Sequence, residues 1–160
     1  MPTKESAADS LISISDPRIA YMEEPFCSKE NQITDILSLC FADADGEGLD
    51  VYGNSVVKDD LMTDEDARRV AEFAHMHQSE YILIHCDAGI SRSAGVAAGI
   101  LKHYTGDDRA IFKSSRFYPN MWCYRKTLKA LHELFPDAAA DNDGLGAAGL
   151  VTEGQAFQSH

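Results

Sequence analysis

The chain has 160 residues, of which 44% are hydrophobic and 25% are charged, a composition typical of one globular domain. Its formal net charge of −12 disfavours nucleic acids and anionic membranes as partners, because both are polyanions. No apolar run approaches the roughly 20 residues of a membrane span. The N-terminal MPTKESAADS also lacks the apolar core of a signal peptide.

The first half of the chain predicts two strands, a loop and a helix. Residues 11–15 (LISIS) and 36–41 (ILSLCF) have the composition of short strands. Residues 42–55 are rich in turn residues and predict a long loop. Thr63 is a good N-cap for a helix that runs to about Gln78. Acidic residues fill the first turn of this helix, and apolar ones recur at i, i+3, i+4 and i+7.

The second half predicts one buried strand and three helices. Residues 81–85 are nearly all apolar, as expected of a strand covered on both faces. A turn at 86–92 precedes an amphipathic helix that ends at Thr105-Gly106. Asp107 or Asp108 can cap a short helix through Phe112, and a last helix runs from the cap Asn120 to Pro136.

These elements favour an α/β fold, in which helices flank a central, mostly parallel sheet. We expect the folded domain to span residues 10–136, after a flexible N-terminus at 1–9. Residues 137–160 are rich in Ala and Gly and show no periodicity, which predicts a disordered tail.

The four cysteines are widely separated and form no CxxC pair. This spacing favours free thiols in a reducing compartment over a disulfide framework or a zinc site. We therefore expect a soluble cytoplasmic protein. The simplest interpretation of Cys40 and Cys123 is that both are buried thiols. Either one can be a redox partner of Cys86 only if folding brings it close.

The stretch YILIHCDAGISRS, residues 81–93, places a cysteine between a buried strand and a turn that opens a helix. Ligands of open α/β sheets bind beyond the carboxyl ends of the strands. The amides of residues 87–92 can wrap around an anion, and Gly89 permits a backbone conformation closed to other residues. The same positive field favours the thiolate form of Cys86, and Arg92 supplies a planar fork for two phosphoryl oxygens. This combination suggests phosphoryl transfer through a phosphocysteine.

The segment HCDAGISRS, residues 85–93, resembles the HCxxGxxR[ST] signature of the cysteine-dependent protein phosphatases, the tyrosine and dual-specificity superfamily. A mid-chain cysteine in a short chain resembles the small dual-specificity branch. AIFKSSRFYPN, residues 110–120, is similar to the family segment in which an alanine, an arginine and a Pro-Asn pair precede the final helix. The following NMWCYRKTL departs from the family's usual phenylalanine and Gln-Leu, so no glutamine role is carried over.

The resemblance implies a dual-specificity-phosphatase-like fold, with the cysteine loop between a central strand and a helix N-terminus. It also implies that Cys86 is the nucleophile and Arg92 the phosphate clamp. His85 would orient the loop and support the thiolate, and Ser93 would donate a hydrogen bond that eases departure of the cysteine. The substrate phosphate would be bound by Asp87, Ala88, Gly89, Ile90, Ser91 and Arg92.

The leaving group of such a reaction needs a proton, which a carboxylic acid on a loop can supply. In the resembling family this aspartate follows the strand that precedes the helix and the cysteine-bearing strand. Here that strand is 36–41, so Asp43 is the first candidate for the general acid and Asp45 the reserve. The alternative is that both aspartates only solvate the turn.

The resemblance implies a phosphatase of phosphotyrosine in proteins, with phosphoserine and phosphothreonine as further candidates. Phosphorylated proteins or peptides are the expected partners, and phosphate, sulfate or vanadate should occupy the loop at 86–92. No metal or other cofactor is required, because backbone amides and Arg92 provide the positive charge. Two alternatives stay open. One is the same chemistry on an inositol phosphate, a nucleotide or an RNA 5′ end, and the other is a catalytically silent phosphate-binding module.

Two further patterns suggest metal sites but fit them poorly. The run DADGEG, residues 43–48, alternates acidic groups like a calcium loop, yet Asp50 and Asn54 stand where an EF-hand needs an apolar residue and a glutamate. His75 and His77 lie two residues apart on a helix and therefore face different directions, which predicts surface positions.

Overall fold

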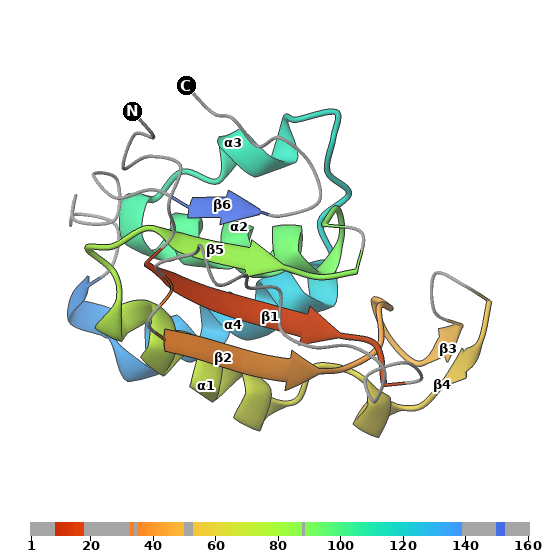
Figure 1. The fold of residues 1–160 in the computed structure, drawn as a ribbon. Helices are drawn as coiled ribbons and strands as arrows, with labels where there is room; N and C mark the ends of the chain where they lie inside the picture. Colours follow the sequence, from red (N-terminus) through yellow and green to blue (C-terminus); the bar gives the residue numbers. More distant parts are fainter. Residues whose placement is uncertain are drawn as a thin grey trace.

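The computed structural model of the chain describes residues 9–17, 33, 35–49, 53–87, 89–138 and 150–152. Its centre is a parallel sheet in the order β2-β1-β5-β6, with helices packed against it (Figure 1). The predicted α/β class with a parallel sheet flanked by helices is confirmed. Within the described part of the chain, no helix has the length and apolar content needed to cross a membrane.

The sheet brings together strands that are far apart in sequence. It consists of β1 (Ser10–Ser15), β2 (Asp35–Cys40), β5 (Ile82–His85) and β6 (Leu150–Thr152), and every neighbouring pair runs parallel. β1 lies between β2 and β5 and is almost completely buried, which explains its aliphatic composition. Because all four strands point the same way, the loops that follow them meet at one edge of the sheet.

β6 lies within the segment that the sequence predicts to be a disordered tail. The prediction is wrong for residues 150–152, which pair with β5 through Leu150 opposite Ile82 and Thr152 opposite Ile84. A strand of three residues is too short to show a period, and its pairing depends on a partner about 70 positions earlier in the chain. Residues 139–149 and 153–160 lie outside the described residues.

The N-terminal boundary of the fold differs from the prediction by one residue. Asp9 belongs to the ordered part, because its amide donates to the carbonyl of Tyr81 and its carboxylate accepts from the amide of Tyr81, both at 3.0 Å. The predicted flexibility of residues 1–8 concerns a segment outside the described residues.

Helix α1 (Asp64–Met76) begins where the sequence predicts. The hydroxyl of Thr63 accepts from the amide of Asp66, and the Asp66 carboxylate accepts from the amide of Thr63, both at 3.0 Å. This reciprocal cap satisfies two donors that a helix start would otherwise leave unpaired. The apolar residues predicted to form its inner face are buried, namely Ala67, Val70, Ala71 and Ala74.

The other helices follow the cysteine-bearing turn. They are α2 (Arg92–Thr105), α3 (Arg109–Phe112) and α4 (Met121–Leu134), as the sequence predicts within two residues. Gly106 ends α2 at a positive φ of 76°. Asn120 caps α4 by accepting from the amide of Cys123 at 2.9 Å, which confirms its predicted role.

Helix α4 packs against both α1 and α2, so the three long helices form one layer (Figure 1). Its contact with α2 is close because α2 carries glycine at two contact positions. A Cβ at Gly95 would collide with the carbonyl oxygen of Asn120, and one at Gly99 would lie 2.9 Å from the Cβ of Thr127. Gly95 thus allows the start of α4 to lie beside the first turn of α2, which brings Asn120 close to the cysteine loop.

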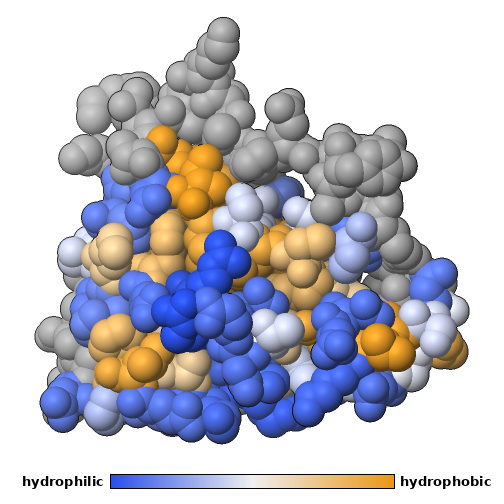
Figure 2. All heavy atoms as spheres, turned by 90° about the horizontal axis from the view of Figure 1, so that it is seen from below, coloured by the Kyte–Doolittle hydropathy of each residue, from blue (hydrophilic) through white to orange (hydrophobic). Residues whose placement is uncertain are grey.

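The region predicted to be one long loop contains a short hairpin. β3 (Gly48–Leu49) pairs antiparallel with β4 (Ser55–Val56), and the 3₁₀-helix η3 (Lys58–Asp60) follows. The two-residue strands lie within the turn-rich sequence and are too short for a pattern to reveal them. From below, hydrophilic side chains cover much of the molecule, with hydrophobic ones between them (Figure 2).

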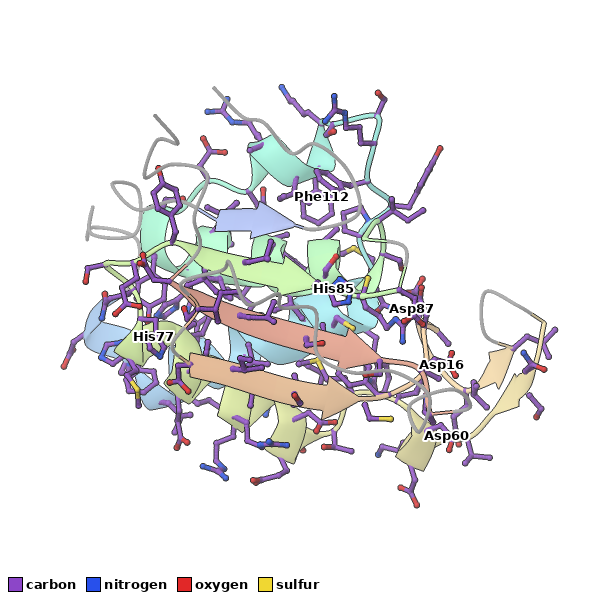
Figure 3. The ribbon with its side chains drawn as sticks, in the orientation of Figure 1. Asp16, Asp60, His77, His85, Asp87 and Phe112 are labelled. Atoms are coloured by element: carbon purple, nitrogen blue, oxygen red, sulfur yellow. The ribbon has the colours of Figure 1, made fainter. Side chains whose placement is uncertain are left out.

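His77 is buried, with 7% of its surface exposed, so its predicted surface position is wrong. It follows the last turn of α1 and lies near the start of β2, where Nε2 is 2.8 Å from the carboxylate of Asp35. Nδ1 is 2.8 Å from the carboxylate of Glu80. The helical pattern used for the prediction ends before this residue, and the partner on β2 comes only from the tertiary fold. Figure 3 shows it beside the N-terminal end of β2.

His77 is expected to make the stability of the fold pH-dependent. Burial lowers the pKa of His77, but its hydrogen bonds to Asp35 and Glu80 outweigh burial and raise the pKa. The stabilisation is therefore complete below the unfolded value of about 6.5 and is lost as the pH rises through the higher folded value. Urea unfolding of the parent and His77→Gln should show a larger difference in stability at pH 6 than at pH 9. An equal difference at both pH values would contradict this assignment.

Candidate active site

The candidate site lies at the edge of the sheet where the parallel strands end. β1 leads into Asp16, β2 into Phe41, and β5 into Cys86 and Asp87. Figure 3 shows Asp16, His85 and Asp87 near this edge. Every predicted loop residue except Ala88, which lies outside the described residues, can be placed here. The expected position of the cysteine loop, between a central strand and a helix N-terminus, is therefore confirmed.

Cys86 is 2% exposed and contacts the first turn of α2. Its sulfur lies 3.3 Å from the hydroxyl of Ser93 and 3.4 Å from the Ser93 amide, which donates to it. The thiol donates to the hydroxyl when protonated, and the hydroxyl can donate to the sulfur when it is a thiolate. Ser93 therefore makes two hydrogen bonds to this sulfur.

The loop between Cys86 and α2 is held in place by the segment before α4. Gly89 has a positive φ of 71°, the conformation predicted to require glycine. The carbonyl of Ile90 accepts from the amide of Tyr118 at 2.8 Å, and the carbonyl of Ser91 accepts from that of Asn120 at 3.0 Å. These bonds tie the cysteine loop to the segment that contains the Pro119-Asn120 pair.

Arg92 is buried, with 1% of its surface exposed, although a fully buried arginine is rare unless it is paired. Nη1 donates to the carbonyl of Phe41 at 2.8 Å, and Nη2 donates to the carboxylate of Asp87 at 3.1 Å. Nε lies 3.9 Å from Oδ2 of Asp43 and makes no hydrogen bond among the described residues. Burial lowers the pKa of Arg92, but the negative groups of Cys86, Asp43 and Asp87 raise it further, so the guanidinium stays charged.

Asp43 belongs to this cluster and is 6% exposed. Its Oδ1 accepts hydrogen bonds from the hydroxyl of Ser91 and the side-chain amide of Asn120, both at 2.8 Å. Its Oδ2 is the oxygen that lies 3.9 Å from Arg92. The structure thus joins Asp43 to the cysteine loop, which the sequence predicts.

Asp45 has a different role in the structure. It is exposed, and its Oδ1 accepts from the amide of Met121 at 3.0 Å. A carboxylate at the first residue of a helix satisfies an unpaired amide and interacts favourably with the helix dipole. The two candidates for the general acid therefore have different partners: Asp43 lies beside Arg92, whereas Asp45 binds the start of α4.

A cavity of about 630 Å³ opens beside the loop, between residues 43–45 and 112–121. Ser91 and Asp43 belong to its wall, whereas Cys86 does not. Its apolar wall includes Phe112, Phe117 and Met121, and Tyr118 stands at the wall with 75% of its surface exposed. Met121, the first residue of α4, lines this cavity as well. No lysine or arginine is part of the described wall.

The carboxylates of the DADGEG segment bind protein donors in different directions. Asp43 faces Ser91, Asp45 faces the start of α4, and Glu47 accepts from the amide of Lys58 at 2.9 Å. Among the described residues, no group of three or more His, Cys, Asp or Glu side chains is arranged to hold a metal ion. Asp50 lies outside the described residues.

The described thiols other than Cys86 are poor nucleophiles. Both are free cysteines: Cys123 is buried as predicted, whereas Cys40 is exposed, so its predicted burial is wrong. Burial raises the pKa of the Cys123 thiol well above its ordinary value, and Asp43 adds to the effect. Burial and the neighbouring Asp16 raise the pKa of Cys40. Both sulfurs therefore carry their protons at neutral pH.

Two contacts of the site were not predicted from the sequence. Asn120 was predicted to cap α4, but the amide nitrogen of the same side chain also donates to Asp43. Asp87 was predicted to bind substrate, but its carboxylate lies on Arg92. His85, the last residue of β5, is half-buried beside the loop (Figure 3), and its predicted orienting role stays a prediction.

Comparisons of the chain with family models, with curated proteins and with solved structures each gave no match. The functional assignment therefore depends on the chain's own residues at the edge of the sheet.

Proposed function

We propose that the chain is a cysteine-dependent phosphatase with a dual-specificity-phosphatase-like fold, which hydrolyses phosphotyrosine in proteins. Phosphoserine and phosphothreonine are further candidate substrates. The observation that carries the proposal is the meeting of Cys86, Ser93, Arg92 and Asp43 at one edge of the sheet. A nucleophile, a hydroxyl, a buried guanidinium and a carboxylic acid are the groups that phosphoryl transfer through a phosphocysteine needs.

In the first step the thiolate of Cys86 attacks phosphorus, so that a sulfur–phosphorus bond forms and the phosphorus–oxygen bond to the leaving group breaks. Arg92 and the loop amides stabilise the charge on the three other oxygens. Asp43 gives its proton to the leaving oxygen, and this avoids release of an unstable alkoxide or phenolate.

In the second step water hydrolyses the phosphocysteine. The carboxylate of Asp43 takes a proton from the attacking water, the phosphorus–sulfur bond breaks, and Cys86 departs as a thiolate. The hydroxyl and amide of Ser93, which lie 3.3 and 3.4 Å from the sulfur, stabilise this leaving group. Inorganic phosphate then leaves the loop, and Asp43 is protonated for the next turnover.

The cavity beside the loop supports an aromatic leaving group. Its wall combines Phe112, Phe117 and Tyr118 with small polar residues, and it presents no basic side chain among the described residues. A phenyl ring is neutral and flat and suits such a wall, whereas a substrate with several phosphates needs cations. The negative net charge of −12 also disfavours polyanionic substrates.

The test is a substrate panel with the purified chain. We expect hydrolysis of p-nitrophenyl phosphate and of phosphotyrosine peptides, with slower hydrolysis of inositol phosphates, nucleotides and RNA 5′ ends. A chain that binds phosphate and hydrolyses none of them would be a silent phosphate-binding module. A strong preference for a non-protein phosphomonoester would contradict the proposed substrate class.

Asp43→Asn should reduce the turnover of a substrate more strongly when its leaving group depends more on a proton. Turnover of phenyl phosphate should fall by about 10²-fold or more, whereas an activated aryl phosphate should be affected much less. The pH profile of turnover should also lose its alkaline limb. Asp45→Asn is the matched control, since it removes a charge two residues away and only weakens the start of α4. If Asp45→Asn shows the selective loss and Asp43→Asn does not, the general acid is Asp45.

Alkylation should distinguish Cys86 from the other described thiols. At pH 6 we expect iodoacetamide to modify Cys86 before Cys40 and Cys123, because the two latter thiols stay protonated. Peroxide should oxidise the same sulfur and abolish activity, and bound phosphate or vanadate should protect it. Peptide mapping that finds Cys40 or Cys123 modified first would contradict the activation of Cys86.

A further inference from the structure

The carboxylate of Asp87, the residue after Cys86, lies on the guanidinium of Arg92. Its Oδ2 accepts from Nη2 at 3.1 Å, and its side chain is 16% exposed. The other oxygen, Oδ1, is buried and has no hydrogen-bond partner among the described residues. A buried carboxylate oxygen without a donor is costly, so this arrangement is not one that optimises folding alone. Figure 3 shows Asp87 just beyond the end of β5.

Asp87 occupies the part of Arg92 that a phosphate needs. Nη1 is held by the backbone carbonyl of Phe41, whereas Nε is open among the described residues. A phosphoryl group bound in bidentate form takes N–H groups from two neighbouring nitrogens of the fork. The edge that offers the open Nε also includes Nη2, where the Asp87 carboxylate lies.

The negative charges around the guanidinium also disfavour the binding of a further anion while Asp87 stays on Arg92. Arg92 faces the carboxylates of Asp87 and Asp43 and the sulfur of Cys86. A phosphomonoester brings up to two more negative charges into this buried place, where water screens them weakly. Ser91 and Asn120 donate hydrogen bonds to Oδ1 of Asp43, the oxygen farther from Arg92. Among the described residues, the Asp87 carboxylate accepts a hydrogen bond from Arg92 alone. Asp87 is therefore the carboxylate that can move away.

We propose that Asp87 is an intramolecular competitor for the phosphate site: its carboxylate occupies Arg92 in the free protein and is displaced by the phosphoryl group. The competition weakens the binding of substrate and of inorganic phosphate, and it speeds the release of phosphate after each turnover. The inference rests on the proposed function, because it takes Arg92 as the phosphate-binding group. Asp87 acts here as a specificity-determining residue and takes no proton in either chemical step.

The test measures inhibition by inorganic phosphate during hydrolysis of p-nitrophenyl phosphate. Asp87→Asn removes the charge with little change of shape, and we expect the inhibition constant of phosphate to fall about tenfold, the factor that one lost charged hydrogen bond represents. KM should fall with it, while kcat stays equal or declines because phosphate leaves more slowly. Asp87→Glu keeps the charge, so the inhibition constant of phosphate should not fall in this variant.

Asp59→Asn is the control for net charge, because Asp59 is exposed on η3 and is not a residue of the cysteine loop. It should leave the inhibition constant and KM unchanged. If Asp87→Asn binds phosphate as weakly as the parent or more weakly, the proposal is wrong and Asp87 positions Arg92 instead. Should Asp87→Asn fail to fold, Asp87→Ser replaces it with the same expectation. Tight binding by Asp87→Glu as well would also overturn the proposal.

A second measurement separates this proposal from the proposed function. The rise in melting temperature caused by inorganic phosphate reports binding without turnover. If the parent does not hydrolyse aryl phosphates, the proposed function fails, yet the phosphate-dependent shift should still be larger for Asp87→Asn. If the parent hydrolyses them and the shift is the same for both proteins, only the proposal on Asp87 fails.

Discussion

Cys86→Ser is expected to reduce turnover of aryl phosphates by on the order of 10⁴-fold or more, because a serine hydroxyl at this position has no base to ionise it. The fold should be unaffected, since the substitution replaces one small side chain that is 2% exposed with another of similar size. Phosphate binding should persist, because Arg92 and the backbone of the loop are unchanged. Steady-state kinetics and the phosphate-dependent melting temperature measure the two effects.

Cys123→Ser is the matched control for this prediction. Cys123 is also buried and free, but its sulfur takes no part in the proposed reaction. It should retain the activity of the parent within a small factor. If Cys86→Ser retained activity within tenfold of the parent, the covalent mechanism would be wrong.

Arg92→Lys is expected to reduce turnover by on the order of 10² to 10³-fold, the usual cost of removing a donor that stabilises a transition state. Lysine keeps the positive charge but presents it at one point, so it cannot hold the Phe41 carbonyl and two phosphoryl oxygens together. The loss should appear in kcat as well as in KM, because the charge on the phosphoryl oxygens is greatest in the transition state.

Arg109→Lys provides the comparison at an exposed site. Arg109 pairs with Asp107 on the surface, so the same substitution there should leave the kinetics unchanged. If Arg92→Lys behaved like Arg109→Lys, Arg92 would be a structural ion-pair residue for Asp43 and Asp87 and not a phosphate clamp.

The elements around the site could be predicted because their signals are local. Thr63 and Asp66 form their cap within one turn, and the apolar run before Cys86 is the buried strand β5. Gly89 takes the positive φ that its place in the turn predicts. In each case the residues that decide the structure lie within a few positions of one another.

The contacts that distinguish one residue from another within the site are long-range and could not be predicted. Asp43 and Asp45 have similar local sequence surroundings. They differ because Asn120 and Ser91 bind the first, while the amide of Met121 binds the second. Asn120 reaches Asp43 only because Gly95 lets α4 approach α2 closely.

The predictions for β6, the last strand of the sheet, and for the buried His77 were wrong for the same reason. β6 exists as a strand by pairing with β5, and His77 is buried because Asp35 on β2 lies beside the end of α1. Neither partner is close in sequence, so no periodic pattern contains the information. The contact between Asp87 and Arg92 is local in sequence, but it depends on the direction of two side chains in an irregular loop.

The most direct test of the proposed mechanism is to trap the phosphoenzyme. The chain is mixed with p-nitrophenyl phosphate, quenched in acid within milliseconds, digested and mapped by mass spectrometry. We expect one phosphate on the peptide that contains Cys86, formed in a burst together with the first equivalent of nitrophenol, and absent in Cys86→Ser. Asp43→Asn should still form it from this activated substrate. Turnover that proceeds with no phosphate on Cys86, or with phosphate on another residue, would contradict the account.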